Sequence, residues 1–402
     1  MVERSRVLVM ASTFPRFEGD TTPPFVLRLC QAMQGEQWES LVLAPHAEGL
    51  ATDSVLEGIR CHRFRYAPER MERLAYGGGM LANVRSMPWL WAVLPFYLLG
   101  LFLAAFRLVR RERIGVIHAH WIIPQGLVAV LLKKLFFRQV RVILTAHGGD
   151  LHANMGGLGR RLLQWTMREA DALAVVSEDM RQIAIRLGMP EERVVVASMG
   201  VDTRAFSPPA ATEERGGLLF VGRLAEKKGV TYLLDAFAKV LPAFPGVRLT
   251  IVGDGPLRGT LEAQAQALGL QGAVSFVGAR PPAEVPAFFR QAAVFVMPSV
   301  VAESGDQEGL GLVAAESLAT GCPVVAHDLP AIRDLVKDGQ TGLMVPPKDT
   351  EALASAIRQL LSDPARAASL AASGRRYILD NYSWAAVAGR YRTLYEPAGT
   401  GR

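Results

Sequence analysis

Short apolar runs rich in β-branched residues alternate with longer segments of helical periodicity along most of this chain. Residues 141–145 and 172–177 are two such runs, and residues 158–169 between them have the spacing of an amphipathic helix. A strand, helix, strand order of this kind places parallel strands in one sheet with helices on both faces. Ligands of such sheets bind beyond the carboxyl ends of the strands. We therefore predict an α/β protein with doubly wound parallel sheets, and we expect its site residues directly after the strands.

The alternation pauses at residues 202–217, a polar stretch with one Pro pair and one Gly pair, and a second series of apolar runs begins at residue 218. Turn-forming residues of this composition mark a linker. A length of 402 residues also suits two domains of about 200 residues each. We predict two Rossmann-like domains, 1–205 and 206–382, that face each other across a cleft. The helices after residue 382 are compatible with packing on either domain.

Three cysteines, Cys30, Cys61 and Cys322, are scattered and lack the spacing of metal ligands. An odd number without a pattern argues against a disulfide framework and against a zinc site. The apolar portion of the N-terminal segment is too short for the hydrophobic region of a signal peptide. We expect a cytoplasmic protein.

Basic charge is concentrated in the first half of the chain. Residues 1–205 hold 25 Lys or Arg and 19 Asp or Glu, whereas residues 206–402 hold 19 of each, so the first half carries the whole formal net charge of +6. Between residues 60 and 141, 14 basic side chains accompany only three acidic ones. A surface this basic attracts anionic partners.

Residues 86–106 form a run of 21 residues without a charge, and arginines flank it on both sides. The length is that of a membrane span, but strand-like runs precede and follow it, so a span would divide one sheet across a bilayer. A fully buried helix and a helix lying in the membrane interface are the other interpretations. Two tryptophans near its start and the arginine cluster at 107–113 are typical of an interfacial helix. We therefore expect residues 85–113 to contact an anionic membrane surface, with the protein peripheral at the inner face of the cell membrane.

The segment Glu308-Gly-Leu-Gly-Leu-Val-Ala-Ala-Glu316 leaves an apolar run, passes through glycine backbone and enters a helix-forming sequence. Gly309 and Gly311 allow backbone N–H groups to approach a phosphate at the start of that helix, where the helix dipole favours negative charge. On one ideal helix the two glutamates would be about 12 Å apart along the axis, whereas the carboxyl pair of a glycoside hydrolase needs roughly 5 to 9.5 Å. The pattern favours two separate hydrogen-bonding roles on one elongated ligand, such as a phosphorylated sugar. Two solvated glutamates after a flexible loop are the alternative.

A basic turn follows the first strand-like run of the second domain, where residues 222–229 read Gly-Arg-Leu-Ala-Glu-Lys-Lys-Gly. Arg223 is able to bind two phosphate oxygens at once and Lys228 adds a point charge, so the turn suits a diphosphate. Lys227 lies in the same turn, and we expect one of the two lysines to be only solvated. A basic surface turn without a ligand is the alternative.

Two loops of the first domain contain further candidates. His147 follows an apolar run, so we expect it to project toward the cleft rather than into the core and to donate a hydrogen bond to a sugar hydroxyl or a phosphate. A structural histidine at a strand end is the alternative. Gly19 lies in the loop after the first run and permits backbone contact with a phosphate or an acceptor. His118 and His120 are two residues apart without a third ligand, so we expect packing roles for them and no metal site.

In this order, the motifs resemble those of the retaining glycosyltransferases of the GT-B architecture, family 4, also called glycosyl transferases group 1. The resemblance covers nearly the whole chain and rests on three blocks. The blocks are residues 147–150, 222–229 and 308–316, the last of them followed by matching segments at 321–326 and 337–343. The resemblance implies that the helices from about residue 383 to residue 402 pack back on the first domain.

The resemblance also implies roles for single residues. Glu308 would contact the donor sugar, and Glu316 would hold the ribose hydroxyls. Arg223 and Lys228 would neutralise the diphosphate, and His147 would lie beside the transferred sugar. The nucleotide base would lie against the backbone near residues 276–280. The predicted catalytic residues are His147, Arg223, Lys228 and Glu308, and the predicted donor-binding residues are Gly19, Asp150, Phe276, Val277, Gly278, Gly309, Leu310, Gly311, Leu312 and Glu316.

The implied activity is transfer of a hexose from a nucleoside diphosphate sugar to a hydroxyl, with retention of the anomeric configuration and without a metal ion or other cofactor. The partners would be a nucleotide sugar and a glycan or lipid-linked acceptor, with no nucleic acid. The loop at 300–307 is longer and more acidic than in many members of that family, which leaves the sugar open. A nucleotide-sugar epimerase and a noncatalytic nucleotide-sugar-binding membrane protein are the competing interpretations.

Overall fold

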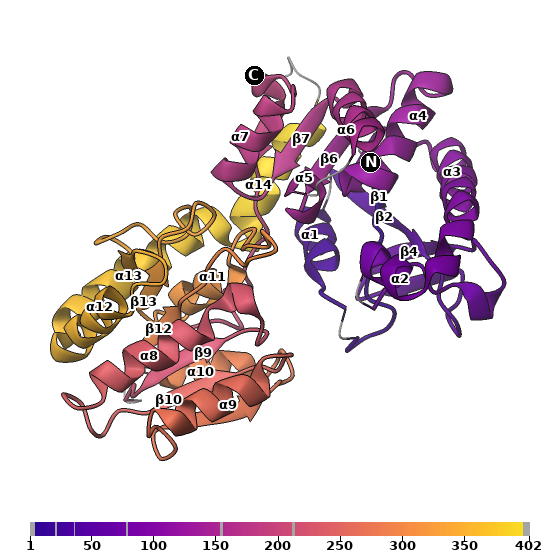
Figure 1. Cartoon of the computed structure of the whole chain (residues 1–402). Helices are drawn as coiled ribbons and strands as arrows, with labels where there is room; N and C mark the ends of the chain where they lie inside the picture. Colours follow the sequence, from indigo (N-terminus) through magenta and orange to yellow (C-terminus); the bar gives the residue numbers. More distant parts are fainter. Residues whose placement is uncertain are drawn as a thin grey trace. The chain divides into compact units, whose positions relative to one another are not determined.

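The computed structural model describes residues 5–20, 22–35, 37–77, 79–152, 156–210 and 214–396. The chain divides into two compact units (Figure 1). The first consists of Met1–Gly200 with Val387–Arg402, and the second of Val201–Ala386. Each unit contains its own sheet with helices on both faces. All strand pairings are parallel except that of β3 with β4 in the first unit, which confirms the predicted α/β class.

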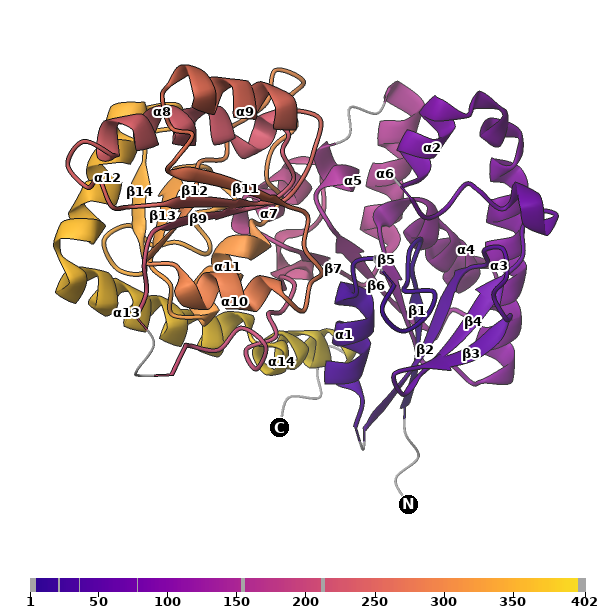
Figure 2. The ribbon, with the colours of Figure 1, turned by 90° about the horizontal axis from the view of Figure 1, so that it is seen from below.

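The sheet of the first unit has eight strands in the order β3-β4-β2-β1-β5-β6-β7-β8. Its topological switch point lies between β1 and β5, because strands are added to opposite sides of β1. Helices α3, α4 and α6 cover one face, and α1 and the end of α14 cover the other (Figure 2). The strands are β1 (Ser5–Met10), β2 (Trp38–Pro45), β3 (Asp53–Leu56), β4 (Ile59–Phe64), β5 (Val116–His120), β6 (Arg141–Ala146), β7 (Ala172–Val175) and β8 (Val194–Val196). The α-helices are α1 (Phe25–Met33), α2 (Met80–Ser86), α3 (Leu94–Arg111), α4 (Leu127–Leu135), α5 (Gly149–His152), α6 (Gly157–Glu169), α7 (Glu178–Arg186) and α14 (Trp384–Tyr395).

A hairpin in the first unit is absent from the sequence prediction. Strand β3 pairs antiparallel with β4, and Glu57 and Gly58 form the turn between them with φ angles of 45° and 83°. Only one of the four residues of β3 is buried. Because the strand lacks an apolar run, the pattern that indicates the other strands does not detect it.

The sheet of the second unit has six parallel strands in the order β11-β10-β9-β12-β13-β14. Its switch point lies between β9 and β12. The strands are β9 (Leu218–Val221), β10 (Leu249–Val252), β11 (Val274–Gly278), β12 (Val294–Met297), β13 (Val324–His327) and β14 (Leu343–Val345). The α-helices are α8 (Val230–Val240), α9 (Arg258–Ala267), α10 (Val285–Gln291), α11 (Leu312–Ala319), α12 (Thr350–Ser362) and α13 (Pro364–Tyr382), and a 3-10 turn, η5, occupies Glu226–Lys228.

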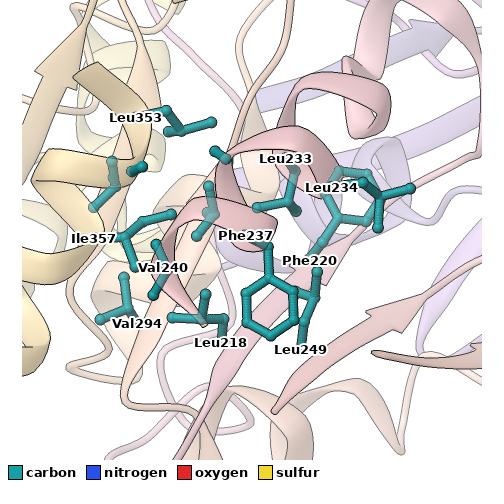
Figure 3. Packing of buried hydrophobic residues seen from close by; sticks show 14 of the residues in the cluster. Leu218, Phe220, Leu233, Leu234, Phe237, Val240, Leu249, Val294, Leu353 and Ile357 are labelled. Atoms are coloured by element: carbon teal, nitrogen blue, oxygen red, sulfur yellow. The ribbon is translucent and has the colours of Figure 1, made fainter. Parts of the chain in front are cut away.

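Helix α8 shows how sequence spacing builds the core of the second unit. Its buried residues include Val230, Leu233, Leu234 and Phe237, which recur with the spacing of one helix face. That face packs on α12 and on the strands at the centre of the sheet (Figure 3). The burial fixes the N-terminal end of α8, and therefore the turn that leads into it from β9.

The apolar run at 86–106 is divided among three elements. Helix α2 ends at Ser86, a 3-10 turn occupies Pro88–Ala92, and α3 begins at Leu94. One side of α3 is buried, but Phe96, Leu99 and Leu103 on its other side are exposed, so the fully buried alternative is wrong. Among the described residues, no helix combines the length and the hydropathy that a bilayer crossing requires.

Candidate active site

The turn after β9 and the loop after β12 lie at the carboxyl edge of the second sheet, on the two sides of its switch point. The backbone N–H of Val300 donates to the carbonyl oxygen of Lys227 at 2.9 Å and joins the two segments. Gly229 closes the turn in the left-handed region, at φ 63°, and a Cβ there would lie 1.8 Å from the carbonyl oxygen of Pro298. A glycine is therefore required where the turn meets the end of β12.

Lys228 and Glu308 face each other across this switch point. The Nζ of Lys228 lies 2.6 Å from Oε1 of Glu308, and the two side chains are 16% and 9% exposed. A largely buried ion pair is screened weakly and holds both groups in place. The structure thus brings together two of the predicted catalytic residues from segments 80 positions apart.

The second lysine of the turn is also paired, which corrects the prediction that one lysine is only solvated. The Nζ of Lys227 lies 3.1 Å from Oδ1 of Asp306, although the Asp306 side chain is mostly exposed. Next to it, the carboxylate of Glu226 accepts a hydrogen bond from the backbone N–H of Glu303 at 2.8 Å. The long acidic loop therefore binds the basic turn at four points, and we call the turn 222–229 with the loop 300–308 the lysine clasp.

Helix α11 follows the clasp, as the sequence predicts. Gly311 precedes the helix with φ 79°, and a Cβ at this position would lie 2.8 Å from Cε of Met297. Leu310 is buried, whereas Gly309 and Leu312 are partly exposed. Glu308 lies outside the helix, so the separation computed for an ideal helix does not apply to the two glutamates.

Glu316 lies in the second turn of α11 and is partly buried. Burial raises the pKa of its carboxyl to about 8, because the charged form loses its hydration. A carboxyl in this state is suited to hydroxyl partners, which it is able to bind as donor or acceptor.

Arg223 is exposed and, within the described part of the chain, forms no ion pair. It comes two residues after β9 ends, at the same sheet edge as Lys228. A guanidinium without a protein anion there is available to a phosphate.

The predicted base-binding residues lie at one end of the second sheet. Phe276, Val277 and Gly278 end the edge strand β11 and are partly exposed. The backbone N–H of Gly253 donates to the carbonyl oxygen of Gly278 at 2.9 Å, and Nη2 of Arg258 donates to that of Phe276 at 3.3 Å. These hydrogen bonds fix the main chain at the end of β11, where the nucleotide base is predicted to lie.

The first unit holds the remaining three predicted site residues. Gly19 is exposed, with φ 83°, in the loop after β1. Next to it, Asp20 accepts from Arg16 at 2.7 and 2.9 Å, and this hydrogen bonding holds the pKa of Asp20 well below its usual range. The loop at the first switch point is therefore closed by an ion pair on itself.

His147 follows β6, is partly exposed and packs among rings, and its predicted projection toward a cleft stays a prediction. Its Nε2 lies 2.9 Å from Nδ1 of His120. The Phe25 and Trp121 rings have centroids 4.8 and 5.0 Å from its own. Burial lowers the pKa of His147 to about 3, so the ring is neutral at physiological pH.

Asp150 secures the turn that carries His147. Its carboxylate accepts from the backbone N–H of His147 at 3.1 Å and from that of Ile122 at 3.3 Å, and burial raises its pKa to about 6. Asp150 therefore ties the segment after β6 to the segment after β5. Its predicted contact with a donor stays a prediction.

Sequence reasoning missed the partners of these residues. The ring pair of His120 with His147 and the ion pair of Lys227 with Asp306 both join segments far apart in sequence. The sequence shows the two histidines at 118 and 120, but the contact of His120 with His147 depends on the pairing of β5 with β6.

The chain has two doubly wound sheets, and one of them holds a basic turn, a glycine-preceded helix and two glutamates at its switch point. These features define the class of GT-B glycosyltransferases. A solved sucrose-phosphate synthase from Thermosynechococcus elongatus superposes with a TM-score of 0.75 over 98% of each chain at 23% identity, which supports the fold. Residues 24–205 match the model of Glycosyltransferase Family 4, and residues 202–377 match that of Glycosyl transferases group 1.

Two curated relatives extend the likeness along the sequence. The glycogen synthase of Mycobacterium tuberculosis is 30% identical over 87% of this chain and 83% of its own length. The GDP-mannose-dependent alpha-(1-6)-phosphatidylinositol monomannoside mannosyltransferase of Mycolicibacterium smegmatis is 34% identical over 65% of this chain and 71% of its own. The chain belongs to the family 4, group 1 glycosyltransferases, enzymes that transfer a sugar from a nucleotide-sugar donor.

Proposed function

We propose that this enzyme transfers a hexose from a nucleoside diphosphate sugar to a hydroxyl of a lipid-linked or polysaccharide precursor, with retention and without a metal ion. The observation that carries the proposal is the lysine clasp together with the start of α11. It offers a cation, free helix N–H groups and a carboxylate within one switch point. The diphosphate would contact the cation and the N–H groups, and the attached sugar would contact the carboxylate.

The chemistry requires a leaving group to be stabilised. As the bond between the anomeric carbon and the diphosphate oxygen breaks, negative charge grows on that oxygen, and Lys228, Arg223 and the start of α11 are the positive groups at the site. The acceptor oxygen forms its bond to the anomeric carbon on the same face. Its proton passes to the departing diphosphate oxygen, so charge and atoms balance without a protein nucleophile.

The clasp also suggests how donor entry changes the site. Lys228 is paired with Glu308. A diphosphate attracts the lysine more strongly than one carboxylate does, because it carries more charge. Glu308 is then free to accept from the sugar hydroxyls, and the ion pair holds both groups where the donor is proposed to bind.

The proposed setting is the surface of an anionic membrane, where lipid-linked acceptors lie. Trp91, Phe96 and Leu99 on η2 (Pro88–Ala92) and α3 are 60%, 62% and 55% exposed. The arginines at 107, 110, 111 and 113 follow them and are also exposed. Apolar side chains next to a basic cluster fit acyl chains below anionic headgroups. The name of the mycolicibacterial relative, which acts on a phosphatidylinositol mannoside, supports a lipid-linked acceptor.

A thermal-shift panel of GDP-, UDP- and ADP-sugars tests the donor. At 100 times its dissociation constant the cognate donor should stabilise the protein by about 2.7 kcal/mol, and Glu316→Ala should abolish that shift. NMR of the product with a simple glycoside acceptor should then show the anomeric configuration of the donor, and EDTA should leave the rate unchanged. An inverted product, or a rate restored only by Mg²⁺ after chelation, would contradict the proposed mechanism.

A further inference from the structure

Two histidine rings of the first unit are joined edge to edge. The Nδ1 of His120, at the end of β5, lies 2.9 Å from Nε2 of His147, after β6. Their ring planes differ by only 11°. His120 is 1% exposed, and both rings lie against Phe25 and Trp121. The pair therefore has little freedom to rotate.

The outer nitrogens of the same two rings have no partner. Within the described part of the chain, neither Nε2 of His120 nor Nδ1 of His147 has a hydrogen-bonding neighbour, and both atoms are buried. Buried polar atoms are normally paired with protein, ordered water or a ligand. The two unpaired nitrogens, one at each end of the hydrogen-bonded pair, thus indicate positions where a ligand hydroxyl or a water molecule binds.

The neighbouring His118 shows the contrast. Its Nδ1 lies 2.8 Å from the hydroxyl of Tyr395, and its Nε2 lies 2.7 Å from that of Thr145. Both nitrogens are used inside the core, and the bond to Tyr395 anchors α14. His118 therefore has a structural role, and it serves as the matched control for His120.

The number of protons on the two rings limits the tautomers that His120 and His147 can adopt together. Burial lowers the pKa of both rings, so each is neutral and carries one N–H. A hydrogen bond between the inner nitrogens needs one hydrogen there and not two. Either both rings carry their proton on Nδ1 or both carry it on Nε2, because any other combination places two hydrogens or two lone pairs face to face.

We propose that His120 is a positioning residue that fixes the tautomer and orientation of His147, and so decides whether His147 offers a donor or an acceptor to the sugar. With both protons on Nδ1, the outer nitrogen of His147 donates. With both on Nε2, it accepts and the outer nitrogen of His120 donates. The inference rests on the proposed function and on the place beside the transferred sugar that the family resemblance implies for His147.

The constraint is testable without any substrate. In the full-length, donor-free protein labelled with 15N-histidine, long-range proton–nitrogen correlation spectra report which nitrogen of each ring is protonated, and His120→Asn and His147→Asn assign the signals among the seven histidines. We expect two neutral rings with the same tautomer at pH 7. Opposite tautomers, or a charged ring, would overturn the proposal. In His120→Leu, the nitrogen shifts of His147 should move, whereas in His118→Leu they should change little.

Turnover separates positioning from packing. The amide of an asparagine reaches the place of Nδ1, whereas that of a glutamine reaches the place of Nε2. With GDP-mannose and UDP-glucose as probes, His120→Gln and His120→Leu should lower kcat by about 100-fold, the cost of a misplaced group near the reaction, and His120→Asn should restore most of it at an equal melting temperature. Full kcat in His120→Leu would overturn the positioning role. Full kcat in His147→Ala would instead remove His147 from the proposed function, while the spectra of the donor-free pair would still decide the tautomer constraint.

Discussion

At the carboxyl ends of β9 and β12 the second unit holds charged side chains, whereas at the ends of β5 and β6 the first unit holds neutral rings. Lys228, Lys227 and Glu308 are held by ion pairs. His118, His120 and His147 are held by hydrogen bonds between uncharged groups, and burial lowers the pKa of each. Both units are built on a doubly wound sheet, so the difference lies in the residues at the strand ends and in the loops after them, and not in the fold class.

The proposed donor, a nucleotide sugar, contains both charged and neutral groups. A diphosphate carries full charge, and only preorganised cations and N–H dipoles offset the cost of removing it from water. A hexose carries hydroxyls, which neutral hydrogen-bonding groups recognise without paying for a buried charge. The comparison predicts that substitutions in the second unit act through charge and that those in the first act through geometry.

The largest effect should come from the cations. Arg223→Ala and Lys228→Ala should each lower kcat by about 100- to 1000-fold, the usual cost of removing one group that stabilises a leaving charge. Arg223 is the cleaner test because it is exposed and, among the described residues, forms no ion pair whose loss would weaken the fold. Steady-state kinetics with the cognate donor and melting curves of each variant measure both quantities.

Lys227→Ala is the matched control for these variants. Lys227 lies in the same turn, but its partner Asp306 is mostly exposed, and a surface ion pair contributes little, about 0 to 1 kcal/mol. Its removal should change kcat by no more than about threefold, within that range. If Lys227→Ala and Lys228→Ala were equally impaired, the charge would act over the whole turn and not at one position.

The sequence carried more information about the second unit than about the first. The glycines and charges of 222–229 and of 308–316 are contiguous, so their order indicates the basic turn and the helix after Gly311, although not the ion pairs that join the two segments. The pairing of His120 with His147 depends instead on the register of two strands, in which His120 lies opposite Thr145. Register and the conformation of a long loop are set by tertiary packing, and neither can be read from local periodicity.

The proposed membrane contact of residues 85–113 offers a second way to sharpen the comparison, because these residues belong to the first unit. Replacing Arg107 and Arg110 by alanine should weaken binding to vesicles by roughly 30-fold, since each basic residue near an anionic surface contributes about 1 kcal/mol. Replacing Trp91, Phe96 and Leu99 by serine should also reduce binding, and all three are exposed enough for the fold to tolerate it. Flotation with phosphatidylcholine vesicles, with and without phosphatidylglycerol, measures both effects.

Leu268→Ser on the second unit is the control for the apolar substitutions, because this leucine is also exposed but lies outside the basic region. It should leave flotation unchanged. Vesicle binding that ignored phosphatidylglycerol and salt would contradict an anionic partner for residues 85–113.

Glu316 provides the smallest and most specific test, through pH. Its folded pKa is about 8 against 4.5 in a model peptide, so between these values the folded state holds a proton that the unfolded state has lost. Stability should therefore fall as pH rises from about 4.5 to about 8, by at most about 1.4 kcal/mol per pH unit. In urea unfolding, the free energy of unfolding of wild type should fall relative to that of Glu316→Gln as pH rises from about 4.5 to about 8, and the difference should be constant outside that window.

The proposed ribose role predicts the opposite pH dependence for ligand binding. If the carboxylate accepts from ribose hydroxyls, a nucleoside diphosphate binds the ionised form. Its affinity should therefore rise by up to about tenfold per pH unit below 8, since 1.4 kcal/mol corresponds to a factor of ten. A pH-independent affinity in wild type, equal to that of Glu316→Gln, would move the ribose to other residues while leaving the phosphate clasp in place.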